Sequence, residues 1–360
     1  MNNINQIDII LPYVDCNDPE WQKLYYENKK KYVKLDETWN DWATGLKRFR
    51  ANGMLKYVLR GIEKFAPWVH KVHMIVQSDS QVPNWINRDT VNIIYHEDFI
   101  PKEYLPTFNS STIEMFLQNI EDLSECFIYG NDDTIFTSPV NITDFFIFKE
   151  KTLSGKLYSN QKLVFGSKLR RKNPNWIGDI LRESNHMLLG NNPVGAVCSI
   201  QHIYLPHKKS IIKEVFKKYN SKILKNISQF RNKNEHNQWL FSEYVYKYYK
   251  YKMYVNRRLN YFSTEINEIT LPKILAKDFS KYKAICLNDH KDTTDEQINK
   301  VLEKINNILP EKSKYELNVH ESSSSLIENN NHIIYQNNDK SCLDDDSSTI
   351  EEDLDTKQQL

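Results

Sequence analysis

The chain has 360 residues, of which 40% are hydrophobic and 12% aromatic, and its formal net charge is only +1. This length and composition predict a soluble globular protein with one large domain or two ordinary ones and ample material for a core. The near-neutral total charge is misleading, because the charges are unevenly distributed along the chain, and no nucleic acid is expected as a partner.

The amino terminus has no basic region followed by an apolar core, and no window approaches 18 uninterrupted apolar residues. Neither a secretory signal nor a membrane-spanning helix is therefore expected. The five cysteines are scattered, which fits neither a disulfide framework nor a zinc knuckle. These features predict a cytoplasmic protein. The clusters Lys29–Lys31 and Lys208–Lys209 leave room for peripheral attachment to anionic lipid at the inner face of the cell membrane.

The first predicted strand is Ile7–Leu11, because this stretch is rich in β-branched residues and is followed by a loop rich in Pro, Asn and Asp. Asp15 lies in that loop, just past the strand end. An aspartate there can contact a nucleotide ribose or base, but a turn or cap role is the more common one. A helix is expected over Pro19–Tyr32, with Asp18 as its N-cap.

A second helix is predicted over Arg48–Phe65, because apolar residues recur on one face of it. Arg48 and Arg50 would lie in its first turn, where positive charge opposes the helix dipole by a few tenths of a kcal/mol. Either these arginines lie just outside the helix or a bound anion offsets the cost. Strands are expected at Lys71–Val76 and Val91–Tyr95.

A third helix is predicted to start within Leu105–Glu114 and to continue to about Ile120. Ser111 and Glu114 fit a capping box, which would make this stretch ordinary helix-start chemistry. A helix start rich in hydroxyl groups is also a ready site for an anion.

The most informative stretch is Phe127–Phe136, an apolar run interrupted by the polar elbow Asn131-Asp132-Asp133. It is typical of a buried strand that ends in a turn. Two adjacent carboxylates at about 4 Å repel by about 1 to 4 kcal/mol unless a cation or proton intervenes. Mg²⁺ or Mn²⁺ carrying a diphosphate would suit such an oxygen pair, and a plain turn is the alternative.

The second half of the chain carries fewer distinct signals. His202 and His207 flank a proline, which excludes a regular helix presenting both on one face. The neighbouring Lys208 and Lys209 favour a surface position for His207 and leave His202 as the preferred catalytic base. Helices are expected over Ile211–Tyr219, His236–Tyr249 and Thr294–Leu309, and Arg231 lies between the first two. Ala284–Asp289 is a second apolar run that ends in Asn-Asp.

The last segment differs in composition. From Glu321 to Leu360, ten acidic residues and two lysines give a net charge of −8, which leaves +9 for the 320 residues before it. Few large apolar groups and runs of Ser, Asn and Asp are typical of a disordered segment. The sequence therefore predicts a folded domain at 1–315 and an acidic, disordered tail at 316–360.

Taken together, these motifs resemble the stealth proteins, a family that includes capsular polysaccharide phosphotransferases and the catalytic part of N-acetylglucosamine-1-phosphotransferase. Four blocks occur in the family's order, near 7–19, 48–133, 200–249 and 285–309. The second block is long and specific. The chain departs from the family at Leu11-Pro12-Tyr13 and at Cys16, and His202 and His207 are rivals for one family histidine.

The resemblance implies an α/β fold of the glycosyltransferase A type, with a Rossmann-like mixed sheet flanked by helices. It implies transfer of a hexose-1-phosphate from a nucleotide-diphosphate sugar, UDP-linked by expectation, to a hydroxyl of a growing capsular or other cell-surface polysaccharide or of a lipid-linked oligosaccharide. Mg²⁺ or Mn²⁺ is the implied cofactor. The implied catalytic residues are His202, Arg48, Arg231 and Glu114, the donor-binding residues Asp15, Ser110 and Asn131, and the metal ligands Asp132, Asp133 and Asp289.

Two other functions stay open from the sequence. A metal-dependent glycosyltransferase would need the same nucleotide-sugar site but would direct attack to the sugar carbon instead of to phosphorus. A non-catalytic carbohydrate-binding protein would explain the 21 tyrosines, but it has no need for several carboxylates and arginines at strand and helix ends.

Overall fold

A computed structural model describes most of the chain, namely residues 6–32, 44–147, 158–159, 163–165, 184, 187–188, 198–200, 203–232, 234–249, 261–289 and 292–317. The chain divides into two compact units, Met1–Asn318 and Val319–Leu360. All described residues belong to the first unit. The predicted acidic tail therefore lies outside the described residues except for Glu316 and Leu317, and so does His202.

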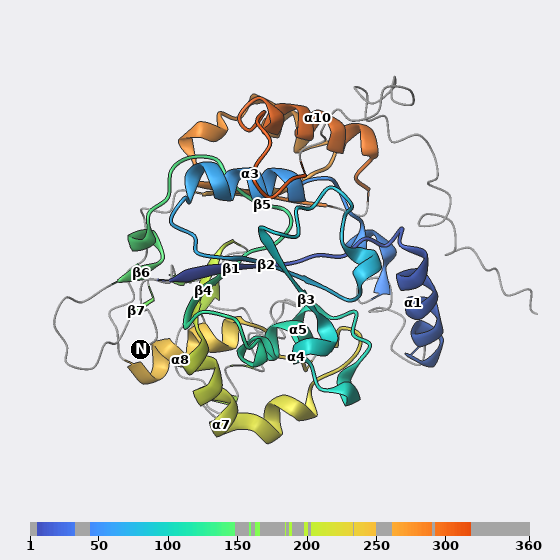
Figure 1. Cartoon of the computed structure of the whole chain (residues 1–360), viewed down its shortest axis with the longest axis vertical. Coiled ribbons are helices and arrows are strands. Elements are labelled where there is room, and N and C mark those ends of the chain that lie inside the picture. Colours follow the sequence, from blue (N-terminus) through green and yellow to red (C-terminus); the bar gives the residue numbers. More distant parts are fainter. Residues whose placement is uncertain are drawn as a thin grey trace, which may run out of the picture. The chain divides into compact units, whose positions relative to one another are not determined.

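A mixed sheet of five strands forms the centre of the first unit, in the order β10-β4-β1-β2-β3 (Figure 1). The first four strands along the sequence are parallel, and β10 runs antiparallel to β4 at one edge. The strands are β1 (Ile7–Pro12), β2 (Val72–Val76), β3 (Val91–Tyr95), β4 (Cys126–Tyr129) and β10 (Leu205–Lys208). The strands predicted at Ile7–Leu11, Lys71–Val76 and Val91–Tyr95 and in the run from Phe127 are confirmed, as is the α/β class with a mixed sheet flanked by helices, whereas β10 was not predicted.

A second sheet has the order β11-β12-β5 and takes its middle strand from the end of the described chain. Its strands are β11 (Tyr261–Glu265), β12 (Ala284–Asn288) and β5 (Thr134–Phe136). Two small pairs complete the described strands: β6 (Phe146–Ile147) with β7 (Tyr158–Ser159), and β8 (Leu163–Phe165) with β9 (Cys198–Ile200). The chain leaves the central sheet at the end of β4 and enters the second sheet at β5, so the elbow 131–133 joins the two.

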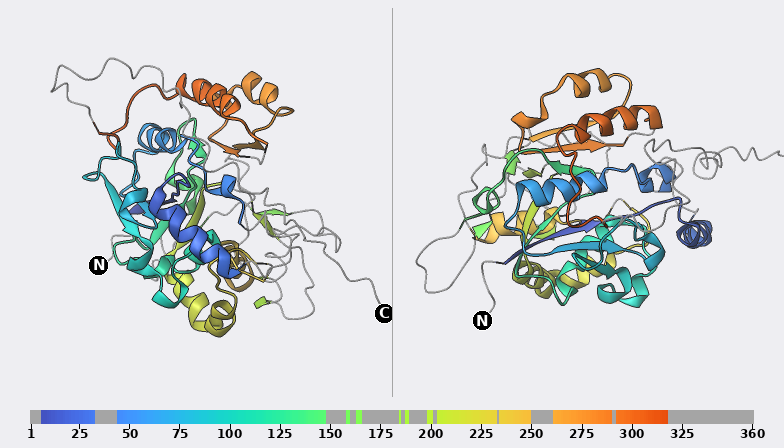
Figure 2. Two further views of the ribbon diagram at one scale, coloured as in Figure 1. Left: turned by 90° about the vertical axis from the view of Figure 1, so that its right-hand side faces the viewer. Right: turned by 45° about the horizontal axis from the view of Figure 1, so that its top comes forward.

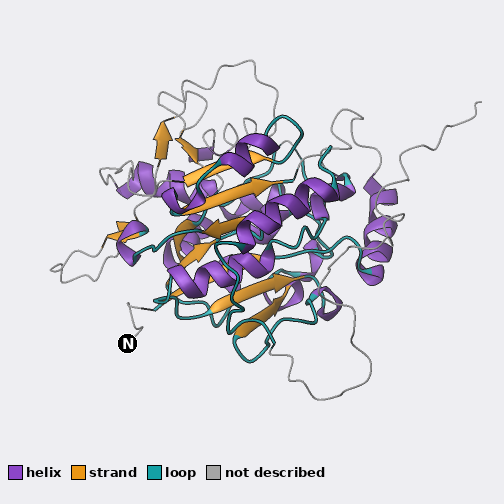
Figure 3. Cartoon of the chain, turned by 90° about the horizontal axis from the view of Figure 1, so that it is seen from above, coloured by secondary structure: helices purple, strands orange, loops and turns teal. Residues whose placement is uncertain are grey.

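Helices cover both faces of the central sheet (Figures 1 and 3). On one side lies α3 (Leu55–Phe65), with α9 (Leu271–Ala276) and α10 (Asp295–Asn306) farther from the central sheet (Figure 1). On the other side lie α4 (His96–Phe99), α5 (Ser110–Met115), α7 (Lys209–Lys225) and α8 (Trp239–Tyr249). Helix α1 (Pro19–Tyr32) stands at the flank (Figure 2). Short 3₁₀ turns lie at Leu46–Phe49, Asp79–Gln81, Lys102–Tyr104, Leu117–Asn119, Ile142–Asp144 and Phe279–Lys281. No helix in these described ranges has both the length and the apolar character needed to cross a membrane.

The strand β1 illustrates why the sheet sits between two cores. Its side chains alternate between the faces, as the period of a strand requires. Ile7, Ile9 and Leu11 join the core that includes α3, whereas Ile10 joins the core that includes α5, α7 and α8. A strand buried on both faces reads as a continuous apolar run, which is the signal that predicted it.

Two predicted helix starts need correction. The helix predicted from Arg48 begins at Leu55, because Asn52 and Gly53 interrupt it and Gly53 adopts a positive φ of 75°. Arg48 and Arg50 therefore precede the helix, which is the first of the two alternatives. In α5 the N-cap is Asn109, whose side chain accepts a hydrogen bond from the backbone of Ser111, so the capping box at Ser111 is wrong.

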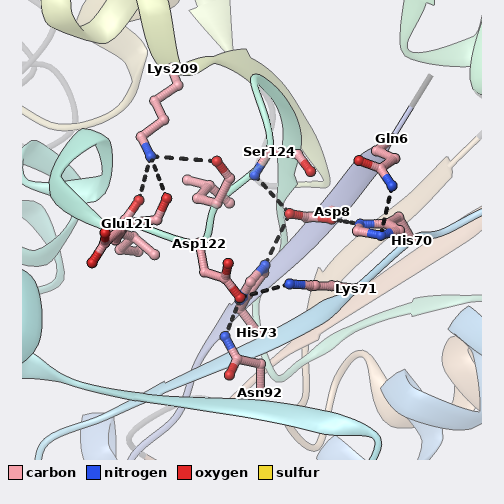
Figure 4. A network of polar contacts seen from close by, with 12 residues as sticks. Gln6, Asp8, His70, Lys71, His73, Asn92, Glu121, Asp122, Ser124 and Lys209 are labelled. Atoms are coloured by element: carbon pink, nitrogen blue, oxygen red, sulfur yellow. Dashed lines mark hydrogen bonds and ion pairs between the residues drawn. The ribbon is translucent and has the colours of Figure 1, made fainter. Parts of the chain in front are cut away.

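A buried carboxylate links neighbouring strands near the amino ends of the central strands (Figure 4). Asp8 on β1 is fully buried and accepts hydrogen bonds from the backbone of Ser124 and from the rings of His70 and His73, at 2.8 to 3.0 Å. Asn92 on β3 contacts the other ring nitrogen of His73 at 2.8 Å. Burial alone would raise the pKa of Asp8, but the bonds from His73, Ser124 and His70 lower it to about 2.

This network predicts acid sensitivity. A carboxyl whose pKa is lowered on folding, here from 3.8 to about 2, stabilises the fold above pH 4 and loses that contribution as the pH falls toward 2. We expect Asp8→Asn to lower the free energy of unfolding at pH 7 by about 2 kcal/mol and to flatten its decline below pH 4. Urea unfolding between pH 3 and pH 7 measures both effects, and an unchanged acid limb in the variant would contradict this role.

A buried ion pair closes the fold near residue 316. The guanidinium of Arg60 on α3 donates two hydrogen bonds to the carboxylate of Glu316, both at 2.8 Å, and further ones to the carbonyls of Leu309 and Pro310. The side chains of Arg60 and Glu316 are 8% and 6% exposed. The packed fold therefore includes the first residues of the segment predicted as tail.

Candidate active site

The elbow between β4 and β5 is fixed by close packing. The backbone N–H of Gly130 donates to the carbonyl of Ile10 at 2.9 Å. A Cβ at Gly130 would lie 2.5 Å from the ring of Tyr204, so only glycine fits there. Tyr204 also stacks on Phe136 at 3.9 Å and donates its hydroxyl to the carbonyl of Thr134 at 2.7 Å. Tyr204 thus contacts both ends of the elbow, a role that the sequence did not reveal although it lies beside the two candidate histidines.

Asp132 and Asp133 follow at the carboxyl end of β4, where ligands gather in open α/β sheets. Both are partly exposed. Loss of solvent around its carboxyl group, and then the charge of Asp133, raise the pKa of Asp132 to about 8. The electrostatics thus match the repulsion predicted from the sequence, and they favour a cation or a proton at this position.

Strand β12 brings a further oxygen toward the elbow. The backbone N–H of Leu287 donates to the carbonyl of Asp133 at 3.3 Å. The thiol of Cys286 lies 3.7 Å from an Asp133 carboxylate oxygen and 3.3 Å from the side-chain oxygen of Asn288. Asn288 is therefore a candidate site residue that the sequence analysis passed over, although it directly precedes the predicted ligand Asp289.

Two arginines from distant parts of the chain form a cationic pair. Burial and then the charge of Arg231 lower the pKa of Arg48 to about 9, while Glu235 acts in the opposite direction. Arg231 donates to the hydroxyl of Ser110 at 2.9 Å, and burial lowers its pKa as well. Glu235 is buried and accepts hydrogen bonds from Asn109 at 2.6 Å and from Ser111 at 3.1 Å. Positive charge held against desolvation in this way favours a bound anion.

An aromatic cluster brings these arginines to the same place. Phe108 stacks on Phe230 with ring centroids 5.0 Å apart, and Tyr25 of α1 contacts Phe49, Phe108 and Phe230 at 5.3 to 5.7 Å. Phe49 follows Arg48 and Phe230 precedes Arg231, while Phe108 is two residues before Ser110. Arg48, Arg231 and Ser110 are therefore positioned by nearby aromatic residues, and the burial of these rings stabilises the arrangement.

Glu114 is the buried carboxyl of this region. It accepts hydrogen bonds from the backbone and the side-chain amide of Gln238, at 2.9 and 3.2 Å. Burial raises the pKa of Glu114 to about 7, although the bonds from Gln238 and the charge of Arg231 oppose the shift. Tyr129 is the last residue of β4, directly before Gly130 and the elbow, and burial together with the neighbouring charges of Glu114 and Asp132 raises its pKa, while Arg231 opposes the shift. The arginine pair, Glu114 and the elbow therefore belong to one site.

His207 does not fit the surface position expected from the neighbouring lysines. Its side chain is 3% exposed, and its ring nitrogen Nε2 lies 2.9 Å from the amide oxygen of Gln238. Burial lowers the pKa of His207 to about 4, with a smaller opposing effect from Gln238. The surface interpretation is wrong, because His207 lies on β10 and its ring packs against Phe127 of β4 and Phe241 of α8. The rival residue, His202, lies outside the described residues.

Two other predicted site residues have different partners. Asp15 lies past the end of β1, where its side chain accepts the backbone N–H of Asn17 at 2.9 Å and its backbone pairs with Gln81, an arrangement typical of a turn. Asp289 accepts two hydrogen bonds from Arg50, each at 2.8 Å, and so carries an ion pair. Among the described residues, no three His, Cys, Asp or Glu side chains form a group able to hold a metal ion.

Comparisons with known proteins agree with the motifs. Residues 48–154 match the family model of stealth protein conserved region 2. The chain is 32% identical over 347 residues to the capsular polysaccharide phosphotransferase WcwK of Streptococcus pneumoniae, covering 88% of this chain and 99% of the relative. It is 30% identical to the receptor polysaccharide phosphotransferase WefC of Streptococcus oralis, covering 87% and 100%.

A solved structure of an active-site mutant of LgtC also matches, with a TM-score of 0.36 and 10% identity, over 83% of this chain and 96% of that one.

Proposed function

Because the chain belongs to the stealth family of polysaccharide phosphotransferases, we propose that it transfers a sugar 1-phosphate from a nucleotide-diphosphate sugar to a hydroxyl of a growing cell-surface polysaccharide. The product would be a phosphodiester, and a nucleoside monophosphate would leave. We propose a UDP-linked donor, in line with the resemblance. The bond that breaks is the phosphoanhydride bond, and the bond that forms joins the sugar-bearing phosphorus to the acceptor oxygen.

The observation that carries this proposal is the arginine pair beside the carboxylate elbow. Arg48 and Arg231 are desolvated cations whose pKa values are lowered by burial. They suit the non-bridging oxygens of a phosphoryl group, on which negative charge is spread in the transition state. Ser110, held by Arg231 at 2.9 Å, adds a hydroxyl at the start of α5. Fixed donors of this kind stabilise charge without reorganising during the reaction.

The elbow fits a divalent cation. Asp132 and Asp133 offer hard oxygen ligands, and the raised pKa of Asp132, caused by burial and then by the charge of Asp133, supports a cation at this position. Asn288 would supply a neutral oxygen. Bound Mg²⁺ or Mn²⁺ would neutralise the diphosphate and the leaving group. Asp289 is not proposed as a ligand, because Arg50 donates to both of its carboxylate oxygens, and its role would be to position the loop after β12.

Glu114 is our choice for the group that takes the acceptor proton, since a pKa of about 7 suits a general base at neutral pH. The base must be deprotonated, so turnover should rise with pH through about 7 and then level off. Glu114→Gln should lose about 10²- to 10⁴-fold in turnover and the ascending limb with it. A pH profile of turnover at saturating donor measures this. An unchanged profile would return the role to His202.

The whole proposal is tested by incubating the protein with a panel of nucleotide sugars, Mg²⁺ and an acceptor oligosaccharide, and by identifying the released nucleotide by mass. Release of the nucleoside monophosphate, together with an acceptor heavier by one sugar phosphate, is the expected result. Release of the nucleoside diphosphate would instead identify glycosyl transfer from the same site. No metal-dependent turnover of any donor would favour a carbohydrate-binding role.

A further inference from the structure

Helix α7 is kinked at Tyr219, and its exposed side is strongly basic both before and after the kink. Five of its lysines are exposed, and its buried face is formed by isoleucines and a valine. The exposed lysines are Lys213, Lys217, Lys218, Lys222 and Lys225. None of them has a carboxylate partner within the part of the chain that the structure describes. Glu214 is the one acidic residue of this helix, and it accepts a hydrogen bond from the hydroxyl of Tyr244 at 2.8 Å.

Some lysines elsewhere are compensated by carboxylates. Lys71, Lys283 and Lys300 each form an ion pair, at 2.5 to 2.7 Å. Of the two clusters noted in the sequence, Lys208–Lys209 is already engaged, because Lys208 pairs with Glu125 and Lys209 donates to carbonyls that precede β4 (Figure 4). Lys213 and Lys217 lie four residues apart before the kink, and Lys222 and Lys225 lie three apart after it. Like charges at these spacings repel, so the uncompensated lysines of α7 favour an anionic partner.

The row of lysines leads to the candidate active site. Helix α7 begins at the amino end of β4, since Lys208 pairs there with Cys126. After the helix ends, the carbonyls of Ser228 and Gln229 accept hydrogen bonds from Thr112 and Phe108 beside α5, and Arg231 follows. The exposed lysines of α1 reach the same place, because Tyr32 contacts Phe230 at 5.2 Å. Lys30 and Lys31 precede that tyrosine.

Aromatic side chains accompany the lysines. The amine of Lys218 lies 3.7 Å from the ring centroid of Tyr248 on α8, and the hydroxyls of Tyr248 and Tyr219 are 2.7 Å apart. Tyr248 is 37% exposed, which is unusual for a large ring in this fold. Lysine and tyrosine both combine an apolar stem or ring with a polar end, and the two together are characteristic of side chains at a membrane surface.

We propose that the α7 face, together with the end of α1, docks on an anionic lipid surface and holds the active site beside it. The inference rests on the proposed function in one respect, namely that docking would bring a lipid-linked acceptor close to Arg48 and Arg231. The docking itself is electrostatic. It should therefore weaken as salt shortens the screening length from about 10 Å at 0.1 M toward about 3 Å at 1 M.

The test is cosedimentation of the full chain with vesicles of phosphatidylcholine alone or with 30% phosphatidylglycerol, without any nucleotide sugar. We expect binding to the anionic vesicles only, and loss of that binding at 0.5 M salt. The variant Lys213→Gln/Lys217→Gln/Lys222→Gln/Lys225→Gln should bind at least about tenfold more weakly, because each lysine near the surface contributes to attraction. Glutamine keeps the helix propensity, and the circular dichroism spectrum should be unchanged.

The matched control makes the same charge change on the side of α9 and α10, with Lys273→Gln/Lys281→Gln/Lys300→Gln/Lys312→Gln. It should bind within about twofold of the wild type, because screening limits the reach of charges that are far from the surface. Equal losses of vesicle binding in the two variants would mean that only the net charge of the protein matters, and would overturn the proposal. Capture by soluble dextran sulfate without vesicle binding would overturn it in favour of an anionic polymer. Failure of the donor assay alone would leave the vesicle result standing.

Discussion

Asp133→Asn and Asp132→Asn are each expected to lower turnover by at least about 10³-fold, which corresponds to about 4 kcal/mol of transition-state stabilisation. The reason is that the cation proposed for the elbow would lose one of its two carboxylate ligands, and with it the charge that neutralises the diphosphate. Neither variant should unfold, since the raised pKa of Asp132 indicates that two charges at the elbow oppose each other. Thermal melting should therefore stay within a few degrees of the wild type.

Two measurements belong together here: donor turnover with Mg²⁺ or Mn²⁺, and calorimetric titration of the protein with Mn²⁺ alone. Donor turnover and Mn²⁺ binding should both be lost in the elbow variants, and EDTA should abolish turnover in the wild type. Asp122→Asn is the matched control, because Asp122 is 70% exposed and pairs with Lys71 on the surface. Full activity in both elbow variants would contradict the assignment of Asp132 and Asp133 as metal ligands. Loss of turnover with Mn²⁺ binding retained would mean that other residues bind the metal.

Removing either partner of the Arg60–Glu316 pair should cause the largest loss of stability. The free energy of unfolding should fall by about 3 to 5 kcal/mol in Glu316→Gln or Arg60→Met, because a single buried charge is left without its partner. Burial raises the pKa of Glu316, yet the bonds from Arg60 outweigh this effect and lower it. Urea unfolding at pH 7 measures the change, and turnover at low temperature should be kept, since neither residue is part of the candidate site.

The double variant Arg60→Met/Glu316→Leu separates the loss of the pair from the loss of packing. It should be more stable than Arg60→Met or Glu316→Gln alone, since no unpaired charge remains. Lys300→Met serves as the surface control and should change stability by less than about 1 kcal/mol, because the Lys300–Glu296 pair is exposed. A double variant as unstable as the sum of the single ones would mean that the ion pair itself contributes little.

The sequence predicted the central sheet well because its signals are local. Ile7–Leu11 and Val91–Tyr95 are continuous or β-branched apolar runs, and the helix Pro19–Tyr32 and its N-cap Asp18 follow from capping chemistry, with the side chain of Asp18 accepting the N–H of Trp21 at 2.6 Å. The elbow was also visible, since two adjacent aspartates at the end of a buried strand are rare without a partner.

What the sequence could not provide was the partner of each group. Nothing local indicates that Arg50 pairs with Asp289, 239 residues away, or that Gln238 holds Glu114. The wrong capping box at Ser111 has the same origin, because the motif fits locally while Glu235 takes the serine hydroxyl in the folded chain. The surface interpretation of His207 considered its neighbours in sequence, and its real neighbours come from β4 and α8.

The pairing of β5 with β12 has a consequence for synthesis. Among the described strands, β5 pairs with β12 alone, and the two are separated by almost 150 residues of chain. Contacts so distant in sequence form late in folding, after the intervening chain has been closed into a loop. As the polypeptide leaves the ribosome from its amino end, Arg48, Asp132 and Asp133 emerge long before the strand that supports the elbow. A partly made chain would thus lack a finished active site, and donor consumption would begin only when the fold is complete.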